Sequence, residues 1–121
     1  MILDTIMKWG FLLSAVLELS AGIIVYLYPT LVFSDALGVM PQFLGLALFV
    51  LGIMNFLCFR HYEASRFFKL MYLGTMFYHA VIAMICYRSG TELLHASAAT
   101  ITHLGVFVLL LIAYMQDIKP S

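Results

Sequence analysis

Four long apolar stretches follow one another along the chain, and the short segments between them hold most of the polar residues. The stretches cover about residues 6–28, 41–59, 67–87 and 96–115. Each is long enough to cross a membrane as an α-helix, because ~20 apolar residues span a hydrocarbon core of ~30 Å. Short connections place successive helices side by side in opposite directions. The pattern therefore predicts an all-α fold, an integral membrane four-helix antiparallel bundle, with residues 1–121 as a single transmembrane domain.

The composition agrees with helices that face lipid rather than water. The chain is 64% hydrophobic and only 10% charged, and a soluble domain of 121 residues needs more polar surface than that. Strands of a transmembrane barrel would alternate apolar and polar residues, and the segment LGLALFVLGIMNFL does not. The formal net charge is zero and the sequence has no basic stripe, so nucleic acid is not expected as a partner.

The basic residues predict the orientation in the membrane, because cytoplasmic connections carry an excess of Lys and Arg. Five of the 6 basic residues fall on one predicted side: Lys8, Arg60, Arg66, Lys69 and Lys119. The connection after the first stretch has no basic residue, and the connection after the third has only Arg88. Both termini are therefore expected in the cytoplasm, with the protein in a cell inner (plasma) membrane.

Each stretch has one face rich in small and polar residues. Lipid is as apolar as leucine, so membrane helices pack through such residues rather than through hydrophobicity. At three- and four-residue spacing, the expected packing faces are Ser14, Ala15, Glu18, Ala21 and Gly22; Gly45, Leu48, Gly52 and Asn55; Tyr72, Thr75, Met76, His79, Ala83 and Cys86; and Ala96, Ala99, Thr100, His103, Phe107 and Tyr114. Each face carries one strongly polar side chain, and we expect both histidines to point inward.

Two segments, AGIIVYLYPTLVFSDALG and PQFLGLALFVLGIMNF, resemble the first half of small bacterial four-helix membrane proteins of the DoxX-like group. The features in common are a glycine late in the first helix, a proline at its outer end and a glycine-rich second helix. Here they are Gly22, Pro29, and Gly45 with Gly52. Members of the group have been linked to quinone-reducing or quinol-oxidising membrane complexes, often as small subunits, so the resemblance implies such a role. This sequence lacks the arginine-bearing helix starts of better-understood members, and no functional residue is carried over.

Glu18, His79 and His103 are predicted to lie at one depth. Glu18 is near the middle of the first stretch, and a rise of 1.5 Å per residue places His79 ~3 Å and His103 ~4 Å to the outer side of the centre. A carboxylate at mid-bilayer costs roughly 2.5–3.5 kcal/mol on insertion scales, so Glu18 is either protonated or paired. A neutral imidazole can both donate and accept. We therefore expect at least one imidazole within hydrogen-bond reach of the carboxyl, directly or through one water.

Four interpretations of these three residues stay open. They are interhelical hydrogen bonds that only hold the bundle together, a bis-histidine haem b, a Zn²⁺ or Fe²⁺ ion held by two imidazoles and a carboxylate, and a quinone or proton-relay site. Because metal sites inside membranes are rare, the sequence assigns no metal ligand. The candidate cofactor-binding residues are His79, His103 and Glu18, with quinone or haem b as the cofactors considered. No catalytic residue is assigned.

Four mostly aliphatic helices leave little surface outside the membrane on which chemistry could take place. The sequence therefore favours a small accessory or assembly subunit of a larger membrane complex, of respiratory or other redox type, with no catalysis of its own. Its expected partners are the lipid bilayer and either another membrane protein or further copies of this chain. The alternative is a membrane protein that handles quinone, haem or protons through the intramembrane Glu18, His79 and His103 cluster.

Overall fold

The computed structural model describes residues 2–36 and 38–118. This part of the chain forms helix α1 (Ile2–Leu27), a 3-10 turn η1 (Pro29–Leu31), and helices α2 (Met40–Arg60), α3 (Arg66–Arg88) and α4 (Ala96–Ile118). Within these residues, all four helices are long and apolar enough to cross a membrane. The predicted all-α class with four such helices is therefore confirmed. The helices extend furthest past the expected ranges at the start of α1 and the end of α4. Lys119, used above to predict orientation, lies outside the described residues.

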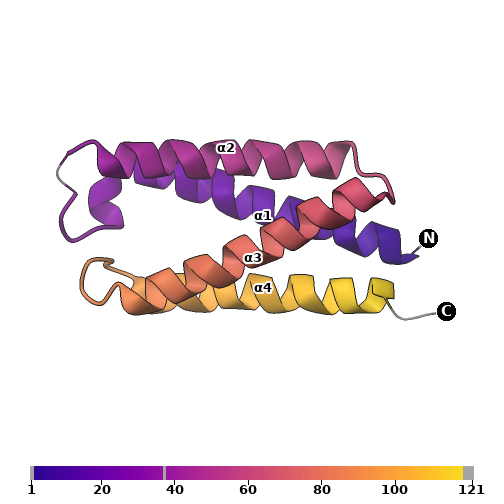
Figure 1. Cartoon of the computed structure of the whole chain (residues 1–121). Coiled ribbons are helices and arrows are strands. Elements are labelled where there is room, and N and C mark those ends of the chain that lie inside the picture. Colours follow the sequence, from indigo (N-terminus) through magenta and orange to yellow (C-terminus); the bar gives the residue numbers. More distant parts are fainter. Residues whose placement is uncertain (1, 37, 119–121) are drawn as a thin grey trace.

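The helix connections are divided between the two ends of the molecule. Both termini and the α2–α3 connection lie at one end, and the α1–α2 and α3–α4 connections lie at the other (Figure 1). At that second end the two connections are joined by backbone hydrogen bonds. The N–H of Ser34 donates to the carbonyl of Glu92 at 2.9 Å, and the N–H of Leu94 donates to the carbonyl of Val32 at 2.9 Å. These bonds join the α1–α2 connection to the α3–α4 connection at the end opposite the start of α1 and the end of α4.

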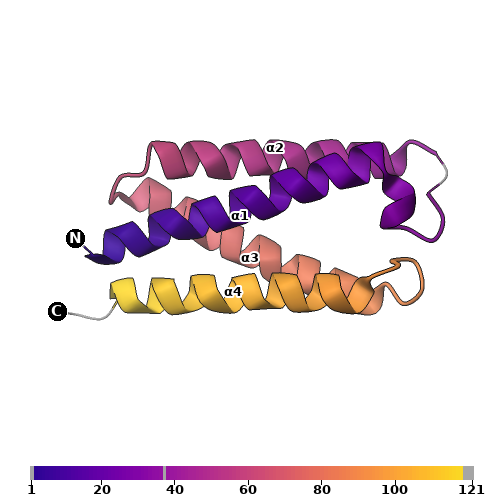
Figure 2. The same ribbon diagram turned by 180° about the vertical axis from the view of Figure 1, so that it is seen from behind.

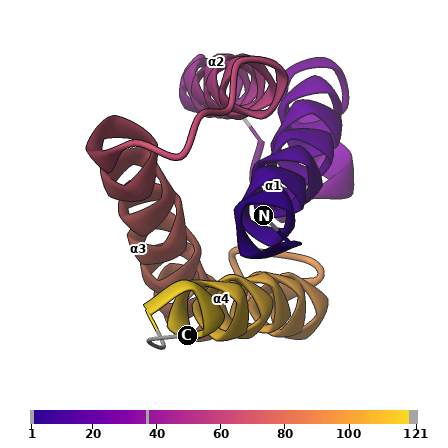
Figure 3. The ribbon, with the colours of Figure 1, turned by 90° about the vertical axis from the view of Figure 1, so that its right-hand side faces the viewer.

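The bundle consists of two closely packed pairs, α1 with α2 and α3 with α4. A third interface joins the two pairs, since α1 begins beside α4 and ends beside α2 (Figure 2). Seen along the bundle, the helices follow one another around a ring in chain order (Figure 3). However, contacts between α2 and α3 are sparse. The side of the bundle between α2 and α3 is therefore its least closed side.

Glycines allow the close approach of α1 and α2. A Cβ atom on Gly22 would lie 2.6 Å from the backbone nitrogen of Phe49, and one on Gly45 would lie 2.5 Å from the backbone nitrogen of Tyr26. Backbone atoms cannot move aside without separating the helices, so only glycine fits at these two positions. This is the packing through small residues that the sequence predicted.

The hydrophobic core lies toward the end that carries the termini. Met7 and Phe11 of α1, Tyr72 of α3 and Leu110 of α4 are its largest fully buried side chains. The ring of Phe11 packs edge-on against Tyr72, with centroids 5.4 Å apart. The Tyr72 hydroxyl donates to the carbonyl oxygen of Leu110 at 3.1 Å. Cys58 of α2 also belongs to the core, which thus joins all four helices and includes a satisfied polar group.

The predicted packing face of α3 is confirmed, because the buried residues of α3 are the six named from the sequence. The faces of α1 and α2 are confirmed in part: Ser14, Ala15, Glu18, Gly22, Gly45, Gly52 and Asn55 are buried, but Ala21 and Leu48 are only half-buried. The face of α4 is also confirmed in part, because its six expected residues are all half-buried. The buried side chains of α4, which the sequence analysis did not name, are Val106, Leu110 and Ala113, on the same side of the helix. They belong to the aromatic core, where large apolar side chains fill the space between helices.

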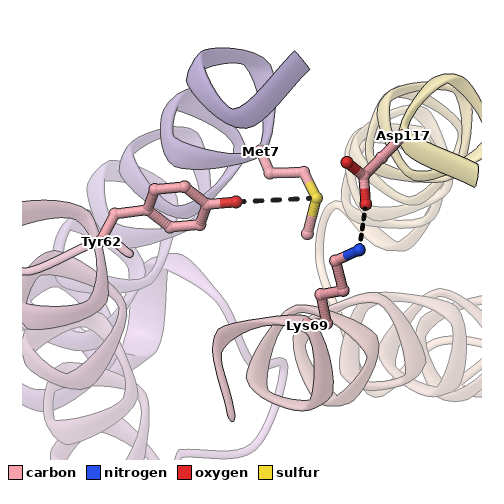
Figure 4. A network of polar contacts seen from close by, with 4 residues as sticks. All are labelled: Met7, Tyr62, Lys69 and Asp117. Carbon is pink, nitrogen blue, oxygen red and sulfur yellow. Dashed lines mark hydrogen bonds and ion pairs between the residues drawn. The ribbon is translucent and has the colours of Figure 1, made fainter. Parts of the chain in front are cut away.

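Polar contacts also join the helices near the termini. Lys69 of α3 places its Nζ atom 2.9 Å from Oδ2 of Asp117 in α4, and the Tyr62 hydroxyl donates to the sulfur of Met7 at 3.9 Å (Figure 4). Tyr62 follows α2, so the second contact links the α2–α3 connection to α1. The two contacts lie at the end of the bundle where the sequence places most of its charge.

Candidate functional site

The structure brings together the three residues that the sequence singled out. Glu18 lies nine residues before the end of α1, His79 nine before the end of α3, and His103 seven after the start of α4. These three helix ends meet at the same end of the bundle, so the residues share one layer. One ligand atom from each of them lies within 4.8 Å of the others. Glu18 and His79 are fully buried, and His103 is half-buried.

The two histidines contact each other directly. The Nδ1 atoms of His79 and His103 are 2.9 Å apart, and the ring centroids are 5.2 Å apart. A neutral imidazole has one donor and one acceptor nitrogen, so one Nδ1 carries a proton and the other accepts it. The Nε2 atom of His79 lies 2.8 Å from Oγ of Ser14. A chain of hydrogen bonds therefore connects α1, α3 and α4.

The carboxyl group of Glu18 is bonded to a tyrosine. The hydroxyl of Tyr78 donates to its Oε2 atom at 2.6 Å. The Oε1 atom is buried and has no hydrogen-bond partner among the described residues. A contact to an imidazole through one water, one of the two forms expected from the sequence, stays a prediction. Among the described residues no imidazole makes the direct hydrogen bond to this carboxyl group. Tyr78 takes that place, because its long side chain reaches from α3 to the carboxyl group on α1.

Sequence reasoning missed Ser14 and Tyr78 as members of the site. Ser14 was assigned to a packing face but not to the histidines, although it precedes Glu18 by one helical turn. Tyr78 is adjacent to His79 and was not assigned to any face. The sequence feature that could have identified them is a hydroxyl group near the depth of Glu18 in an otherwise apolar segment. We refer to Ser14, Glu18, Tyr78, His79 and His103 together as the polar cluster.

Helix α2 contributes a neutral polar pair beside the polar cluster. The hydroxyl of Thr75 lies 3.0 Å from Oδ1 of Asn55 and donates to it. Thr75 is one turn before His79 on α3, so this pair lies closer than His79 to the start of α3. An opening of about 150 Å³ lies between α2 and α3, and Asn55, Thr75 and Tyr78 are among the residues that line it. Tyr78 therefore connects the opening to Glu18.

The geometry does not fit a haem. A bis-histidine haem needs the two imidazoles on opposite faces of the porphyrin. The facing Nδ1 atoms of His79 and His103, 2.9 Å apart, leave no layer for a macrocycle between them. A cavity of about 250 Å³ lies between α1 and α2 and has an apolar lining that includes Gly22, Gly45 and Phe49. It does not include any residue of the polar cluster.

No protein-family model, no curated protein and no solved structure matches this chain. The resemblance to DoxX-like proteins that the sequence analysis predicts from two segments stays a prediction. Function is therefore inferred from the polar cluster and its surroundings.

Proposed function

We propose that the protein is a multi-pass protein of a bacterial-type inner membrane, related to the DoxX-like group, and that it is a proton-handling subunit of a larger membrane redox complex. In this proposal its four antiparallel helices cross the bilayer with both termini in the cytoplasm, and it has no catalytic reaction of its own. The α2–α3 connection, flanked by Arg60 and Arg66, lies at the same end as the termini (Figure 1). This grouping of basic residues supports the orientation.

One observation carries the proton-handling role: Glu18, Tyr78, His79 and His103 meet in a buried layer, and one carboxyl oxygen is left without a partner. Hydrogen bonds that only joined helices would be expected to satisfy every buried polar atom, because an unpaired one costs about 1–3 kcal/mol. The Oε1 atom of Glu18 does not meet that expectation. The free-energy cost of leaving Oε1 unpaired therefore supports a role for Glu18 in proton exchange.

The side chains of the polar cluster suit such an exchange. A carboxyl, a phenol and two imidazoles can each donate or accept a proton according to their state. We propose that the Tyr78–Glu18 bond and the Ser14–His79–His103 chain act as one centre, since one ligand atom each of Glu18, His79 and His103 lies within 4.8 Å of the others. Tyr78 would connect this centre to the opening between α2 and α3.

The subunit role is supported by the sparse contacts between α2 and α3. Their opening has polar residues in its lining, which is an unfavourable surface to leave against lipid. We propose that a partner membrane protein lies against this side. A photo-crosslinker at Met54, which lines the opening, should capture that protein in native membranes. A crosslinker at Ile101, exposed on α4, is the matched control. Equal capture from both positions, or from neither, would rule out a partner on this side.

Infrared spectroscopy of the protein in lipid nanodiscs tests the proton exchange. A protonated carboxyl has a carbonyl stretching band that a carboxylate lacks. We expect such a band to change in intensity between about pH 5 and 9, to be absent in Glu18→Gln and to remain in Glu63→Gln. Glu63 is exposed in the α2–α3 connection and is therefore the matched control. A spectrum in which no pH-dependent band disappears with Glu18→Gln would show that Glu18 does not exchange protons in this range.

A further inference from the structure

We infer that the polar cluster binds one divalent first-row transition metal ion, with Glu18, His79 and His103 as its protein ligands. This inference deepens the proposed function, because it assigns a ligand to the same centre. The donor set is one carboxylate oxygen and two imidazole nitrogens. Zn²⁺ is bound by this set in His₂Glu sites, and Fe²⁺ is bound by two histidines and a carboxylate in non-haem sites.

The distances are close to those of a metal site. Nitrogen ligands bonded to Zn²⁺ at ~2.0–2.1 Å lie about 2.9–3.4 Å apart when the angle between the bonds is octahedral to tetrahedral. The two Nδ1 atoms are 2.9 Å apart. The carboxylate oxygen lies within 4.8 Å of both histidines, so changes in side-chain torsions suffice to bring it to a common ion. Each ligand comes from a different helix, and the bundle as a whole fixes their positions.

The surrounding hydrogen bonds match those around metal ligands. A histidine bound through one nitrogen generally donates its other N–H to a nearby acceptor, and ligating carboxylates are hydrogen-bonded as well. Ser14 provides the acceptor at Nε2 of His79, and Tyr78 donates to Oε2 of Glu18. The atoms left to bind a metal ion are Nδ1 of His79, which faces His103, and the unpartnered Oε1 of fully buried Glu18. A cation would provide the partner that Oε1 lacks.

Metal binding at this centre displaces a proton. In the proposed step, the metal-free centre starts with a proton on the Glu18 carboxyl and another on one of the two facing Nδ1 atoms. When the ion binds, the carboxyl proton leaves and a metal–oxygen bond forms. The imidazole proton moves from Nδ1 to Nε2 of the same ring, so each histidine stays neutral and offers a lone pair. The balance is one metal ion bound and one proton released. Metal and proton therefore compete for Glu18.

Titration of the metal-free protein in nanodiscs with Zn²⁺ and, separately, Co²⁺ tests the inference. We expect one ion per chain by calorimetry and a Co²⁺ absorption spectrum that reports nitrogen and oxygen ligands. Glu18→Gln and His103→Gln should abolish this binding. Tyr78→Phe, which removes only a hydrogen bond to a ligand, should weaken it by about 10–100-fold. His95→Gln is the matched control, because His95 is exposed just before α4 and should bind as the wild type does.

Two results separate this inference from the proposed function. Calorimetry in buffers with different ionisation enthalpies should give about one proton released per Zn²⁺ bound. If neither ion binds the wild type more tightly than Glu18→Gln and His103→Gln, both shown to be folded by circular dichroism, the metal inference is wrong. In that case the infrared band of Glu18 alone decides whether the proton-handling role is correct. If metal binds while no proton is released and no band titrates, the metal site stands and the proton-handling role is wrong.

Discussion

The hydroxyl of Tyr78 lies 2.6 Å from Oε2 of Glu18 and connects the middle of α3 to α1. Tyr78 and Glu18 are 60 residues apart in the sequence, and only the arrangement of the helices brings them together. The contact involves one oxygen of the carboxyl group, Oε2. The histidines bond to each other and to Ser14 rather than to the carboxyl, and Oε1 has no partner among the described residues.

The first prediction concerns this hydrogen bond. Tyr78→Phe leaves both carboxyl oxygens of Glu18 without a donor, so the free energy of unfolding should fall by about 1 kcal/mol. Denaturation in mixed micelles measures the change. Tyr87→Phe is the control, because Tyr87 is 79% exposed near the end of α3 and should have little effect. A Tyr78→Phe variant as stable as Tyr87→Phe would show that the contact does not stabilise the fold.

The second prediction concerns the α1–α2 interface. Gly22→Ala places a Cβ atom 2.6 Å from the backbone nitrogen of Phe49, so the helices must move apart. Overfilling of a packed interface costs typically about 1–3 kcal/mol, and the variant should unfold at a lower denaturant concentration. Gly105→Ala is the matched control, since a Cβ at Gly105 would meet nothing within 4 Å. Helix propensity predicts that Gly105→Ala is neutral or stabilising by roughly 0.5–1 kcal/mol. Equal effects of the two substitutions would contradict the close packing.

The third prediction concerns orientation. Asp35 lies in the α1–α2 connection and Ser65 in the α2–α3 connection, at opposite ends of the bundle (Figure 1). An impermeant thiol reagent added to intact cells should label Asp35→Cys and not Ser65→Cys. The native cysteines, Cys58 and Cys86, are both buried, and the parent protein provides the background. Labelling of Ser65→Cys alone would reverse the orientation and place the termini outside.

The fourth prediction concerns the neutral polar pair. Asn55→Leu removes the acceptor for the Thr75 hydroxyl, which can still donate to the carbonyl of Met71 at 3.1 Å. Because Thr75 keeps a partner, stability should change by less than about 1 kcal/mol. The loss of a polar group from the α2–α3 side should nevertheless reduce crosslinking of a partner from Met54. Unchanged crosslinking would show that Asn55 does not take part in the interface.

The sequence predicts those features that depend on local pattern. Length and apolarity predict the four helices. Small and polar residues at helical spacing correctly identify the packing face of α3 and most of the faces of α1 and α2, because close helix approach needs glycine and buried polar groups need partners. On α4 they identify the inward side of the helix but not its most buried residues. Val106 and Leu110 lie at helical spacing from His103 and are buried by the aromatic core, which a search for small and polar residues does not detect.

The composition of the site was predictable only in part. The depths of Glu18, His79 and His103 follow from residue counting, and the structure brings them into one layer. Which of them bond to each other depends on how each helix is rotated about its axis and on the reach of neighbouring side chains. Neither the Tyr78–Glu18 bond nor the mutual contact of the histidines could be predicted without that information.

The central claim is that the Tyr78–Glu18 bond and the Ser14–His79–His103 chain form a single centre. Nitrogen-15 NMR of histidine-labelled protein in nanodiscs, recorded against pH for the wild type and Glu18→Gln, tests it most directly. The account predicts that the ring-nitrogen shifts of His79 and His103 change together with the Glu18 carboxyl. It also predicts that Glu18→Gln removes this change, while the shifts of exposed His61 and His95 are the same in both proteins. Shifts of His79 and His103 that are identical in the wild type and in Glu18→Gln at every pH would contradict the claim.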